Sequence, residues 1–384
     1  MPRVAVICQF DEERWYSIDL VAEMLLTQFA KLPCEQIQAI RIQPTFRRFV
    51  SQPSPGRPQK LRDRFDRLFN RIVLYPNYLR KIAGSYDVFH IVDHSYSQLI
   101  RGLDPNRTVI TCHDLDAFRL ILDPHADPRP IGLKPVAQHL LTNFRRAAHV
   151  VCVSGTVRAE ALRYGIVQEE RSSVAHNGVH PSCSPNPDPV SDQAAAALLP
   201  FPGSIPLLLH VGSTIRRKRI ELLLRAFHGL RGQTPARLVR VGGPLNQEQG
   251  ELADSLGVHS EIIELPFLDR NTLAAVYRRS NLLLMTSDRE GFGLPLAEAM
   301  ACGCPVVCTD LAVLREIGGD SAEYVDSADP AVWSATISKV LEEQAHSPEM
   351  WAQRVSQSIQ TASRFSWANT AKSLLAVYER VSRQ

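Results

Sequence analysis

Short apolar runs alternate with amphipathic stretches along almost the whole chain. In the first half, runs of strand length lie at residues 3–10, 37–43, 87–92, 108–112, 150–154 and 173–176. The second half repeats the scheme, with runs at residues 206–211, 237–241, 261–266, 281–286 and 305–309. Helical spacing of apolar residues falls between many of these runs, as at residues 18–29 and 137–147. Strands that are apolar on both faces and alternate with helices are typical of parallel sheets covered on both sides. The pattern therefore predicts an α/β protein built from two doubly wound, Rossmann-like halves.

The length of the chain and its proline distribution predict two domains joined by a linker. A chain of 384 residues suits two domains of about 150–200 residues each. Between the two halves, prolines cluster over residues 181–203. We therefore expect a first domain over residues 1–185, a linker over 186–204 and a second domain over 205–365. A helical pattern predicts a last helix within residues 366–384.

Composition excludes a disordered chain and gives no sign of a membrane span. Hydrophobic residues make up 45% and charged residues 22% of the chain, which is the balance of a globular protein. The longest uncharged apolar runs are far shorter than the roughly 20 residues that cross a bilayer. The chain opens on a strand pattern rather than a secretory signal, so we expect a cytoplasmic protein. No CxxC pair or neighbouring histidine completes a zinc set, so the cysteines are expected to be structural thiols.

The most informative stretch is a glycine-containing loop that follows one of the expected strands. Residues 287–308 read SDREGFGLPLAEAMACGCPVVC. Two glycines allow a tight loop, and Pro295 suits the first turn of a helix. A glycine loop that leads into a helix N-terminus presents free N–H groups to a diphosphate. Glu290 in the loop and Glu298 in the helix have the spacing E-x7-E. Taken alone, the stretch also fits an ordinary strand–turn–helix crossover with two solvated glutamates.

A second glycine loop carries clustered positive charge. It follows the expected strand at residues 206–211, and residues 210–220 read HVGSTIRRKRI. Four cations at the start of a helix oppose the helix dipole, so we expect an anion to bind beside them.

Together these stretches resemble the retaining glycosyltransferases of the GT-B fold, in particular glycosyltransferase family 4. The resemblance is strong over residues 205–310 and patchy over residues 87–180. It implies two Rossmann-like domains that face a central cleft, with the C-terminal helix packing back on the first domain. It also implies that the second domain binds the donor and the first domain binds the acceptor.

The resemblance implies a role for each matching residue of the second half. Glu290 approaches the hydroxyls of the donor sugar as a catalytic residue, and Glu298 binds the ribose hydroxyls. The implied diphosphate contacts are Gly212, Arg217, Lys218, Gly293 and Leu294, and those on the base side are Pro266 and Phe267. Fixed cations stabilise the charge that develops on the leaving diphosphate. Many family members have arginine directly after the first glycine, where this chain has Ser213.

The first half contributes a histidine that resembles a family site residue. Residues 111–116 read TCHDLD, and the resemblance places His113 close to the donor sugar and the reacting centre, as a catalytic residue. Asp114 and Asp116 also form a D-x-D, the metal–nucleotide motif of the other glycosyltransferase fold. The two-domain layout and the E-x7-E spacing instead favour the fold that neutralises the diphosphate with amides, lysine and arginine. No metal and no other cofactor is therefore expected.

A polar group after the expected strand at residues 87–92 is the candidate acceptor side. Its members, together with one residue of the D-x-D, are Asp93, His94, Tyr96 and Asp114. Capping of a helix by Asp93 or Ser95 is the alternative interpretation of this group.

One segment of the first half is strongly basic. Residues 47–81 contain ten Lys or Arg and two Asp, whereas the whole chain has a net charge of only +3. Residues 59–73 place apolar side chains at helical spacing, with arginines around them at Arg62, Arg64, Arg67 and Arg71. The simple interpretation is an amphipathic helix packed on the first sheet. The alternative is contact of residues 59–81 with the inner face of an anionic membrane. Nucleic acid is not expected, because no binding module accompanies the charge.

We therefore interpret the chain as a retaining, metal-independent hexosyltransferase. It is expected to move a mannose- or glucose-type hexose from a UDP- or GDP-linked sugar to a hydroxyl of a sugar or lipid-linked acceptor, in polysaccharide, glycolipid or glycoconjugate synthesis. Two alternatives stay open. One is a sugar-nucleotide 2-epimerase, which needs no acceptor, and the other is a non-catalytic nucleotide-sugar-binding partner on the same scaffold.

Overall fold

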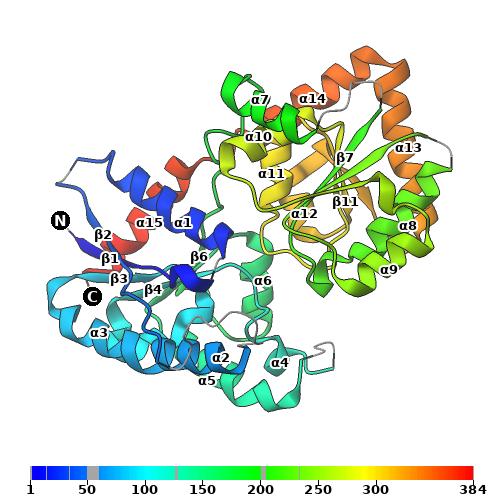
Figure 1. Cartoon of the computed structure of the whole chain (residues 1–384). Coiled ribbons are helices and arrows are strands. Elements are labelled where there is room, and N and C mark those ends of the chain that lie inside the picture. The colour runs from blue at the N-terminus through cyan, green and yellow to red at the C-terminus, as the bar shows by residue number, and fades with distance from the viewer. Residues whose placement is uncertain are drawn as a thin grey trace. The chain divides into compact units, whose positions relative to one another are not determined.

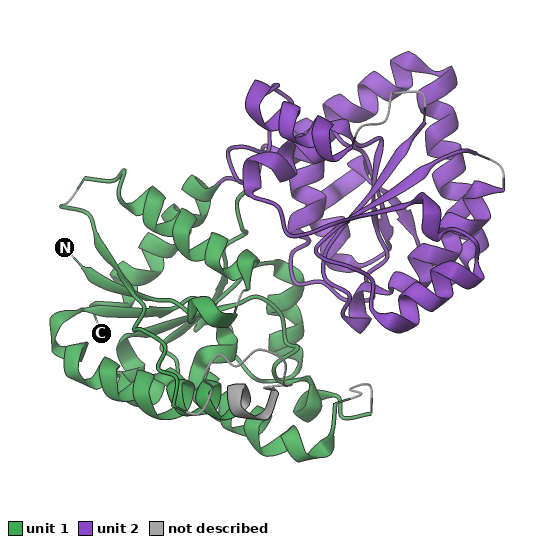
Figure 2. Cartoon of the chain, viewed as in Figure 1, with its two compact units in different colours: residues 1–178, 367–384 green, residues 179–366 purple. Residues whose placement is uncertain are grey.

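The structure, a computed structural model of the 384-residue chain, consists of two compact units. It describes residues 2–13, 15–33, 35–49, 60–125, 129–199, 205–232 and 234–383, with the backbone alone for 60–64. Unit 1 comprises residues 1–178 and 367–384, and unit 2 comprises residues 179–366 (Figure 2). Each unit contains one parallel six-stranded sheet, which confirms the predicted α/β class with two Rossmann-like halves.

Unit 1 has the strand order β2-β1-β3-β4-β5-β6. Its strands are β1 (Arg3–Ile7), β2 (Gln38–Ile42), β3 (Val88–Ile91), β4 (Thr108–Cys112), β5 (His149–Cys152) and β6 (Ser172–Val174). Its helices are α1 (Tyr16–Phe29), α2 (Lys60–Phe69), α3 (Tyr75–Ile82), α4 (Arg119–Leu122), α5 (Lys134–Phe144), α6 (Gly155–Arg163) and α15 (Trp367–Val381). Figure 1 shows α1 and α15 on one side of the sheet and α3 and α5 on the other. Every residue of β3, β4 and β5 is accordingly buried.

The last helix, α15, is joined to the sheet of unit 1 by buried hydrogen bonds. The Tyr378 hydroxyl lies 2.6 Å from Nδ1 of His90, and Nε2 of His90 lies 2.7 Å from the Thr111 hydroxyl. Burial lowers the pKa of His90 to about 3, so the ring is neutral and can donate through one nitrogen and accept through the other. The Thr370 hydroxyl also donates to the His176 carbonyl oxygen at 2.6 Å. These bonds hold the C-terminal segment on the same unit as the N-terminal strands.

Unit 2 has the strand order β12-β11-β10-β7-β8-β9. Its strands are β7 (Leu207–Val211), β8 (Arg237–Val241), β9 (Ile262–Leu265), β10 (Leu282–Met285), β11 (Val306–Thr309) and β12 (Glu323–Val325). Its helices are α7 (Pro189–Leu198), α8 (Ile220–Arg231), α9 (Gln247–Ser255), α10 (Arg270–Arg279), α11 (Leu294–Ala301), α12 (Ala312–Gly318), α13 (Pro330–His346) and α14 (Pro348–Ala362). Figure 1 shows α8 and α13 on one side of this sheet and α10 and α11 on the other.

The strand order of unit 2 reverses at β7, which is flanked by β8 and β10. At such a reversal, the connections from neighbouring strands leave toward opposite faces of the sheet and open a crevice at its carboxyl edge. The loops that follow β7 and β10 are therefore the place where a ligand of unit 2 is expected. The same argument in unit 1 points to the loops after β1 and β3.

The expected linker at residues 186–204 is not an extended connection throughout. Its described part contains α7, which belongs to unit 2 and packs on α10. Asp192 of α7 forms an ion pair with Arg278 of α10, with 2.6 Å between Oδ1 and Nη2. Pro189 stands in the first turn of α7, where a missing N–H is tolerated. The prolines that suggested a linker therefore include one that starts a helix, and the boundary between the units falls earlier, at Gly178.

Over its described side chains, those of residues 65–69, helix α2 does not bury its apolar residues as the sequence suggested. It continues into a π-helical turn, Asn70–Leu74. Asp66 and Asn70 are fully buried, because their side-chain oxygens accept the N–H groups of Phe49 (3.2 Å) and Arg47 (2.9 Å). By contrast, the apolar side chains that remain exposed are Phe65, Leu68, Ile72 and Val73. This segment thus buries polar groups and presents apolar groups.

The two described arginines of α2 and the π-helical turn, Arg67 and Arg71, lie in different environments. The guanidinium of Arg71 turns inward and lies 4.1 Å from the centroid of the Tyr96 ring. It is 4.0 Å from the carboxylate of Glu13, whereas Arg67 is about half exposed and lies 3.9 Å from the same group. The Arg71 side chain therefore packs against unit 1, whereas that of Arg67 is more exposed. The side chains that lie outside the described residues are those of Arg62 and Arg64.

Within the described ranges, no helix combines the length and apolar character needed to cross a bilayer.

Candidate functional site

Two loops of unit 2 are tied together at the carboxyl edge of the sheet. One follows β7 and includes the short turn Arg216–Lys218, and the other follows β10 and leads into α11. The Thr286 hydroxyl donates to the Lys218 carbonyl oxygen at 2.8 Å, and the Asp288 N–H donates to the Arg217 carbonyl oxygen at 2.9 Å. These bonds fix the two cations of the first loop against the second loop.

Glu290 lies between these two cations. Its carboxylate accepts hydrogen bonds from Nζ of Lys218 at 2.6 Å and from Nη1 of Arg217 at 3.3 Å. The Glu290 side chain is only 8% exposed. Burial by itself raises the pKa of Glu290, but the charges of Lys218 and Arg217 outweigh it and lower the pKa. The structure thus brings together three of the predicted site residues as an ionised carboxylate with two cations.

Gly293 begins α11 beside this group. Its φ of 86° lies in the left-handed region that favours glycine, and a Cβ here would come within 2.6 Å of the Leu314 side chain. Pro295 occupies the first turn of the helix. The Leu294 N–H at the helix start has no carbonyl partner inside the helix, whereas the Leu296 N–H donates to the Gly293 carbonyl oxygen at 3.0 Å. The start of α11 is therefore suited to an anion.

Glu298, the second glutamate of the spacing, lies in a different environment from Glu290. It is buried in α11, and its Oε2 accepts a hydrogen bond from the Tyr277 hydroxyl of α10 at 3.0 Å. Burial raises the pKa of Glu298 to about 7, although Tyr277 and Arg270 act in the opposite direction. Glu298 is therefore close to half-ionised at neutral pH.

Gly212, Pro266 and Phe267 also lie at the carboxyl edge of unit 2. The Gly212 N–H donates to the Val241 carbonyl oxygen at 2.9 Å, directly after β7. Pro266 and Phe267 follow β9 and are exposed, the latter by 56%. The N–H groups of Gly242 and Gly243 donate to the carbonyl oxygen that ends β9, at 3.2 and 3.1 Å. The loops after β7, β8 and β9 thus form one continuous edge.

In unit 1, two histidines lie together after β3 and β4. The His113 N–H donates to Nδ1 of His94 at 3.3 Å, and the ring Nε2 of His113 donates to the Val92 carbonyl oxygen at 2.7 Å. Burial lowers the pKa of His113, and the nearby His94 lowers it further. Burial also acts to lower the pKa of His94, but the carboxylates of Asp114 and Asp93 outweigh it and raise the pKa. The neutral His113 ring therefore has Nδ1 as its unprotonated nitrogen.

The two aspartates beside these histidines have different roles in the fold. Asp93 is buried and caps the following 3-10 helix, because it accepts the N–H and the hydroxyl of Ser95 at 2.8 and 2.6 Å. The capping interpretation therefore accounts for Asp93. Asp114 is partly exposed, and its Oδ1 lies 3.4 Å from Nε2 of His94.

Tyr96 is a core residue of unit 1. It is 2% exposed, and its ring packs against those of Phe10 and Tyr75 with centroids 6.4 Å apart in each case. Its hydroxyl donates to Glu13 Oε1 at 3.3 Å. Of the four predicted acceptor-side residues, the structure places Tyr96 and Asp93 in structural positions.

Two residues near the unit 2 site were missed by the sequence analysis. Tyr277 lies in the middle of an ordinary helical pattern, so only the packing of α10 on α11 shows that it contacts Glu298. Arg240 is fully buried in β8, next to the Gly212 loop. A second cation within a short, mostly apolar strand, two residues before a Gly-Gly pair, is the signal that would have found it.

Among the residues that the structure describes, no group of three or more His, Cys, Asp and Glu side chains is placed to hold a metal ion. The thiols of Cys302, Cys304 and Cys308 are buried, and burial raises the pKa of Cys304 and Cys308. They pack in the core as small apolar side chains.

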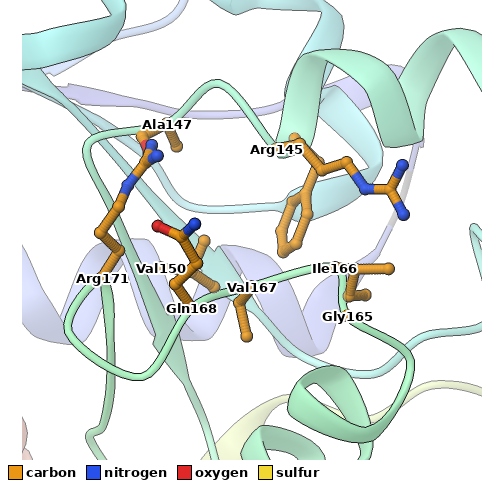
Figure 3. A pocket seen from close by; sticks show the side chains of 9 residues that line it. Arg145, Ala147, Val150, Gly165, Ile166, Val167, Gln168 and Arg171 are labelled. Carbon is orange, nitrogen blue, oxygen red and sulfur yellow. The ribbon is translucent and has the colours of Figure 1, made fainter.

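A separate hollow of about 170 Å³ lies at the opposite edge of the unit 1 sheet, where β5 begins. Figure 3 shows Arg145 and Arg171 on opposite sides of it, with Val150 and Ile166 between them. The guanidinium of Arg171 donates to the Ala147 carbonyl oxygen. None of the predicted site residues lines this hollow.

Two parallel Rossmann-like sheets, with the charged group and the glycine-started helix of unit 2, are typical of the glycosyltransferase class. Comparison with known proteins agrees. The family model "Glycosyl transferases group 1" matches residues 195–358, and the model "Glycosyltransferase Family 4" matches residues 31–182. The chain belongs to glycosyltransferase family 4, as the resemblance in its sequence predicted.

Individual relatives show how far the similarity extends. D-inositol 3-phosphate glycosyltransferase of Mycolicibacterium smegmatis is 31% identical over 309 residues, which cover 77% of this chain and 68% of the relative. Among solved structures, sucrose-phosphate synthase of Thermosynechococcus elongatus superimposes with a TM-score of 0.73 at 18% identity, covering 99% of each chain. Anabaena HepE, solved with UDP-glucose, gives a TM-score of 0.72 at 17% identity and covers all of both chains. The last two comparisons establish the GT-B fold.

Proposed function

We propose that this glycosyltransferase is a retaining enzyme that moves a mannose- or glucose-type hexose from a UDP- or GDP-linked sugar. The acceptor is a hydroxyl group of a sugar or lipid-linked molecule, and the product serves polysaccharide, glycolipid or glycoconjugate synthesis. Unit 2 binds the donor, unit 1 binds the acceptor, and no metal ion takes part.

The contact of Glu290 with Arg217 and Lys218 is the observation on which this proposal depends. One group of side chains offers a carboxylate for the sugar hydroxyls and two cations for the diphosphate. The lowered pKa of Glu290 keeps it ionised, so hydrogen bonds from sugar hydroxyls are charge-assisted. As the bond between the sugar and the diphosphate breaks, negative charge grows on the leaving oxygen, and the fixed cations stabilise it. Two fixed cations next to a helix N-terminus make a divalent ion unnecessary for this step.

Glu298 supports the nucleotide part of the proposal. Glu298 lies in α11, the helix that begins directly after Gly293 and whose start is suited to the diphosphate. A carboxylate accepts two neighbouring ribose hydroxyls well, and the Tyr277 hydroxyl holds it in place. The relative crystallised with UDP-glucose has the same fold, which is consistent with a nucleotide-sugar donor.

In unit 1, His113 is the proposed catalytic residue, close to the donor sugar and the reacting centre. Its Nε2–H is fixed by the Val92 carbonyl oxygen, so Nδ1 is oriented and can accept a proton or a hydrogen bond. His94 and Asp114 lie beside it and fix its surroundings.

The test begins with a thermal-shift screen of UDP-, GDP- and ADP-sugars. A ligand at 100 times its Kd stabilises a protein by about 2.7 kcal/mol, so the true donor should stand out. The selected donor is then incubated with a panel of sugar acceptors. NMR should show that the new glycosidic bond of the product has the same anomeric configuration as the donor. An inverted configuration would refute the retaining mechanism. Conversion of the donor alone into its 2-epimer would refute transfer itself, and binding of a donor without any turnover would favour a non-catalytic partner.

We propose in addition that residues 59–81 contact an anionic membrane. The observation in favour is the exposure of Phe65 and Leu68, each 52% exposed, with Ile72 and Val73 along the same segment. Exposed apolar side chains among basic residues suit a bilayer interface, where apolar groups insert and cations meet lipid phosphates.

Co-sedimentation with vesicles that contain phosphatidylglycerol tests this contact. The double change Phe65→Ser and Leu68→Ser should release the protein, whereas Val190→Ser, at an exposed apolar position of unit 2, should not. Binding should also weaken with salt, because the Debye length falls from about 10 Å at 0.1 M to about 3 Å at 1 M. Absence of the wild-type protein from the vesicle pellet at low salt would end the membrane proposal.

A further inference from the structure

Arg240 is a buried cation that forms no ion pair with a described residue; burial lowers its pKa, and the charge of Glu264 acts in the opposite direction. It lies in β8 and has no exposed surface, and among the described residues its Nε and Nη1 atoms have no hydrogen-bond partner. In the sheet it stands between His210 of β7 and Glu264 of β9. The Glu264 carboxylate is exposed and accepts the Leu245 N–H at 2.6 Å, and burial together with Arg240 and Lys218 lowers the pKa of His210, which keeps it neutral. A desolvated, unpaired guanidinium of this kind is costly to the free protein.

Among the described residues, the hydrogen bond of the Arg240 side chain runs to the glycine loop after β7. Its Nη2 donates to the Gly212 carbonyl oxygen at 3.4 Å. The neighbouring Gly242 allows this approach, because a Cβ there would come within 2.5 Å of the same oxygen. Gly242 has a φ of 128°, which also favours glycine. Two residues at the end of β8, Arg240 and Gly242, therefore lie against the Gly212 carbonyl oxygen.

This arrangement determines where the next N–H points. In a planar trans peptide, the carbonyl of one residue and the N–H of the next point in opposite directions. Because the Gly212 oxygen points toward Arg240, the Ser213 N–H points away from it, out of the sheet edge. Among the described residues, no protein acceptor binds this N–H. It is an oriented donor at the edge where the predicted diphosphate contacts lie.

The other two cations of the site, Arg217 and Lys218, form ion pairs. Lys218 and Arg217 both contact the carboxylate of Glu290, so their charges are partly compensated in the free protein. Arg240 forms no ion pair among the described residues, and burial outweighs the effect of the Glu264 charge on its pKa, so its positive charge adds to the potential behind the loop. An anion at the loop would offset that charge, because opposite charges attract more strongly in a protein interior than in bulk water.

We propose that Arg240 is a positioning residue for the diphosphate of the nucleotide-sugar. It orients the Gly212–Ser213 peptide so that the Ser213 N–H faces the ligand, and it supplies a positive charge that the bound diphosphate compensates. This inference rests on the proposed function, since the diphosphate is the ligand. It predicts opposite effects on stability and on binding, because the charge that attracts the ligand is unpaired without it.

The experiment compares Arg240→Met, Arg240→Lys and the control Arg237→Met. Arg237 lies on the same strand but pairs with Glu261, away from the glycine loop. Calorimetry measures the Kd values of UDP, GDP and ADP and of the matching nucleosides, and thermal unfolding measures the free proteins. For Arg240→Met we expect an affinity for the bound diphosphate lower by about tenfold or more, since a charge-assisted hydrogen bond network is weakened. Its nucleoside affinity should be unchanged, and its melting temperature should be equal or higher.

The lysine variant should recover part of the diphosphate affinity, and Arg237→Met should match the wild type. The inference is wrong if Arg240→Met binds the diphosphate as tightly as the wild type. It is also wrong if that variant melts lower and loses diphosphate and nucleoside affinity equally, because that result describes a purely structural residue. If the wild type itself binds no nucleoside diphosphate, the proposed function fails, and the role of Arg240 fails with it.

Discussion

The carboxyl edges of the two sheets carry polar groups of different kinds. In unit 2 the edge concentrates full charges, with Glu290 within 3.3 Å of both Arg217 and Lys218. In unit 1 the edge presents two imidazoles, His94 and His113, whose pKa values are shifted in opposite directions. The first arrangement suits a ligand that carries phosphate, whereas the second suits a neutral hydroxyl and the movement of a proton. The difference supports a donor in unit 2 and an acceptor in unit 1.

Within unit 2, the pKa values of the two glutamates of the E-x7-E spacing are also shifted in opposite directions. Glu290 is buried next to two cations, and its pKa is lowered. Glu298 is buried next to a hydroxyl group, and its pKa is raised to about 7. Environment therefore gives two identical side chains different charges at neutral pH.

The largest effect is expected for Glu290→Gln. The carboxylate that accepts the sugar hydroxyls is lost, so transfer should slow by about 100-fold or more. The affinity for free nucleoside diphosphate should stay the same or rise, because Arg217 and Lys218 are released from Glu290. Steady-state transfer rates and calorimetric Kd values measure the two effects separately. A parallel loss of both would assign Glu290 to the diphosphate rather than to the sugar.

The sequence was sufficient for the fold and for the residues of the charged group. Parallel strands that are apolar on both faces leave a periodic signal, and β4 and β8 begin and end where the pattern predicted. The family resemblance also indicated Glu290, Arg217 and Lys218, which the structure brings together. It could not indicate that the two cations contact Glu290, because the three residues meet only when the loops after β7 and β10 are joined.

Other features depend on contacts that are distant in sequence. Tyr277 and Arg240 acquire their importance only from neighbouring elements, α11 for the first and the Gly212 loop for the second. Asp66 is buried in α2 because it binds the backbone of the segment before it, and that bond reverses the expected inward face of the helix. Local periodicity does not contain such information.

The next largest effect is expected for His113→Gln in unit 1. If Nδ1 of His113 contacts the reacting groups, transfer should slow by roughly 10- to 100-fold, at the lower end of the contribution of a positioned proton-transfer group. The affinity for the donor diphosphate should not change, because unit 2 binds it. Rates and Kd values for the same two variants, His113→Gln and Glu290→Gln, sharpen the contrast between the units. A loss of diphosphate affinity in His113→Gln would contradict the assignment of diphosphate binding to unit 2 alone.

A smaller effect, with a clear pH dependence, is expected for Glu298→Gln. At pH 8 the variant should bind the nucleoside diphosphate about tenfold more weakly, since the ribose loses a charge-assisted hydrogen bond. Between pH 6 and pH 8 the wild-type affinity should rise as Glu298 ionises, and this component should be missing in the variant. Equal pH profiles for the two proteins would show that Glu298 does not bind the ribose.

The same variant also tests the pH dependence of stability. The contribution of Glu298 to stability should fall as the pH rises, whereas its contribution to diphosphate affinity should grow. The pKa of Glu298 is raised on folding, from 4.5 to about 7, so its protonated form is favoured in the folded protein. The stabilisation is complete below pH 4.5 and is lost as the pH rises through about 7, with a total of about 3 kcal/mol. Denaturant unfolding of wild type and Glu298→Gln should therefore diverge between pH 5 and pH 8, with the variant gaining relative stability at the higher pH. A constant difference across this range would contradict the raised pKa.

The smallest effect is expected for Tyr277→Phe. The Tyr277 hydroxyl stabilises the ionised form of Glu298, so its removal should raise the pKa of Glu298 further. The pH at which nucleoside diphosphate affinity is half-maximal should move upward, with only a few-fold loss at pH 8. Calorimetry across the pH range measures the shift. Movement of this midpoint to lower pH would contradict the described contact.

The central claim is that fixed cations of unit 2, rather than a metal ion, neutralise the leaving diphosphate. The most direct measurement is the transfer rate in EDTA for the wild type and for the double change Arg217→Ala and Lys218→Ala. The account predicts that the wild type keeps its rate in EDTA and that the double variant is slower by at least about 100-fold, with weaker diphosphate binding. Loss of wild-type activity in EDTA, restored by manganese, would contradict the account and return attention to the D-x-D of Asp114 and Asp116.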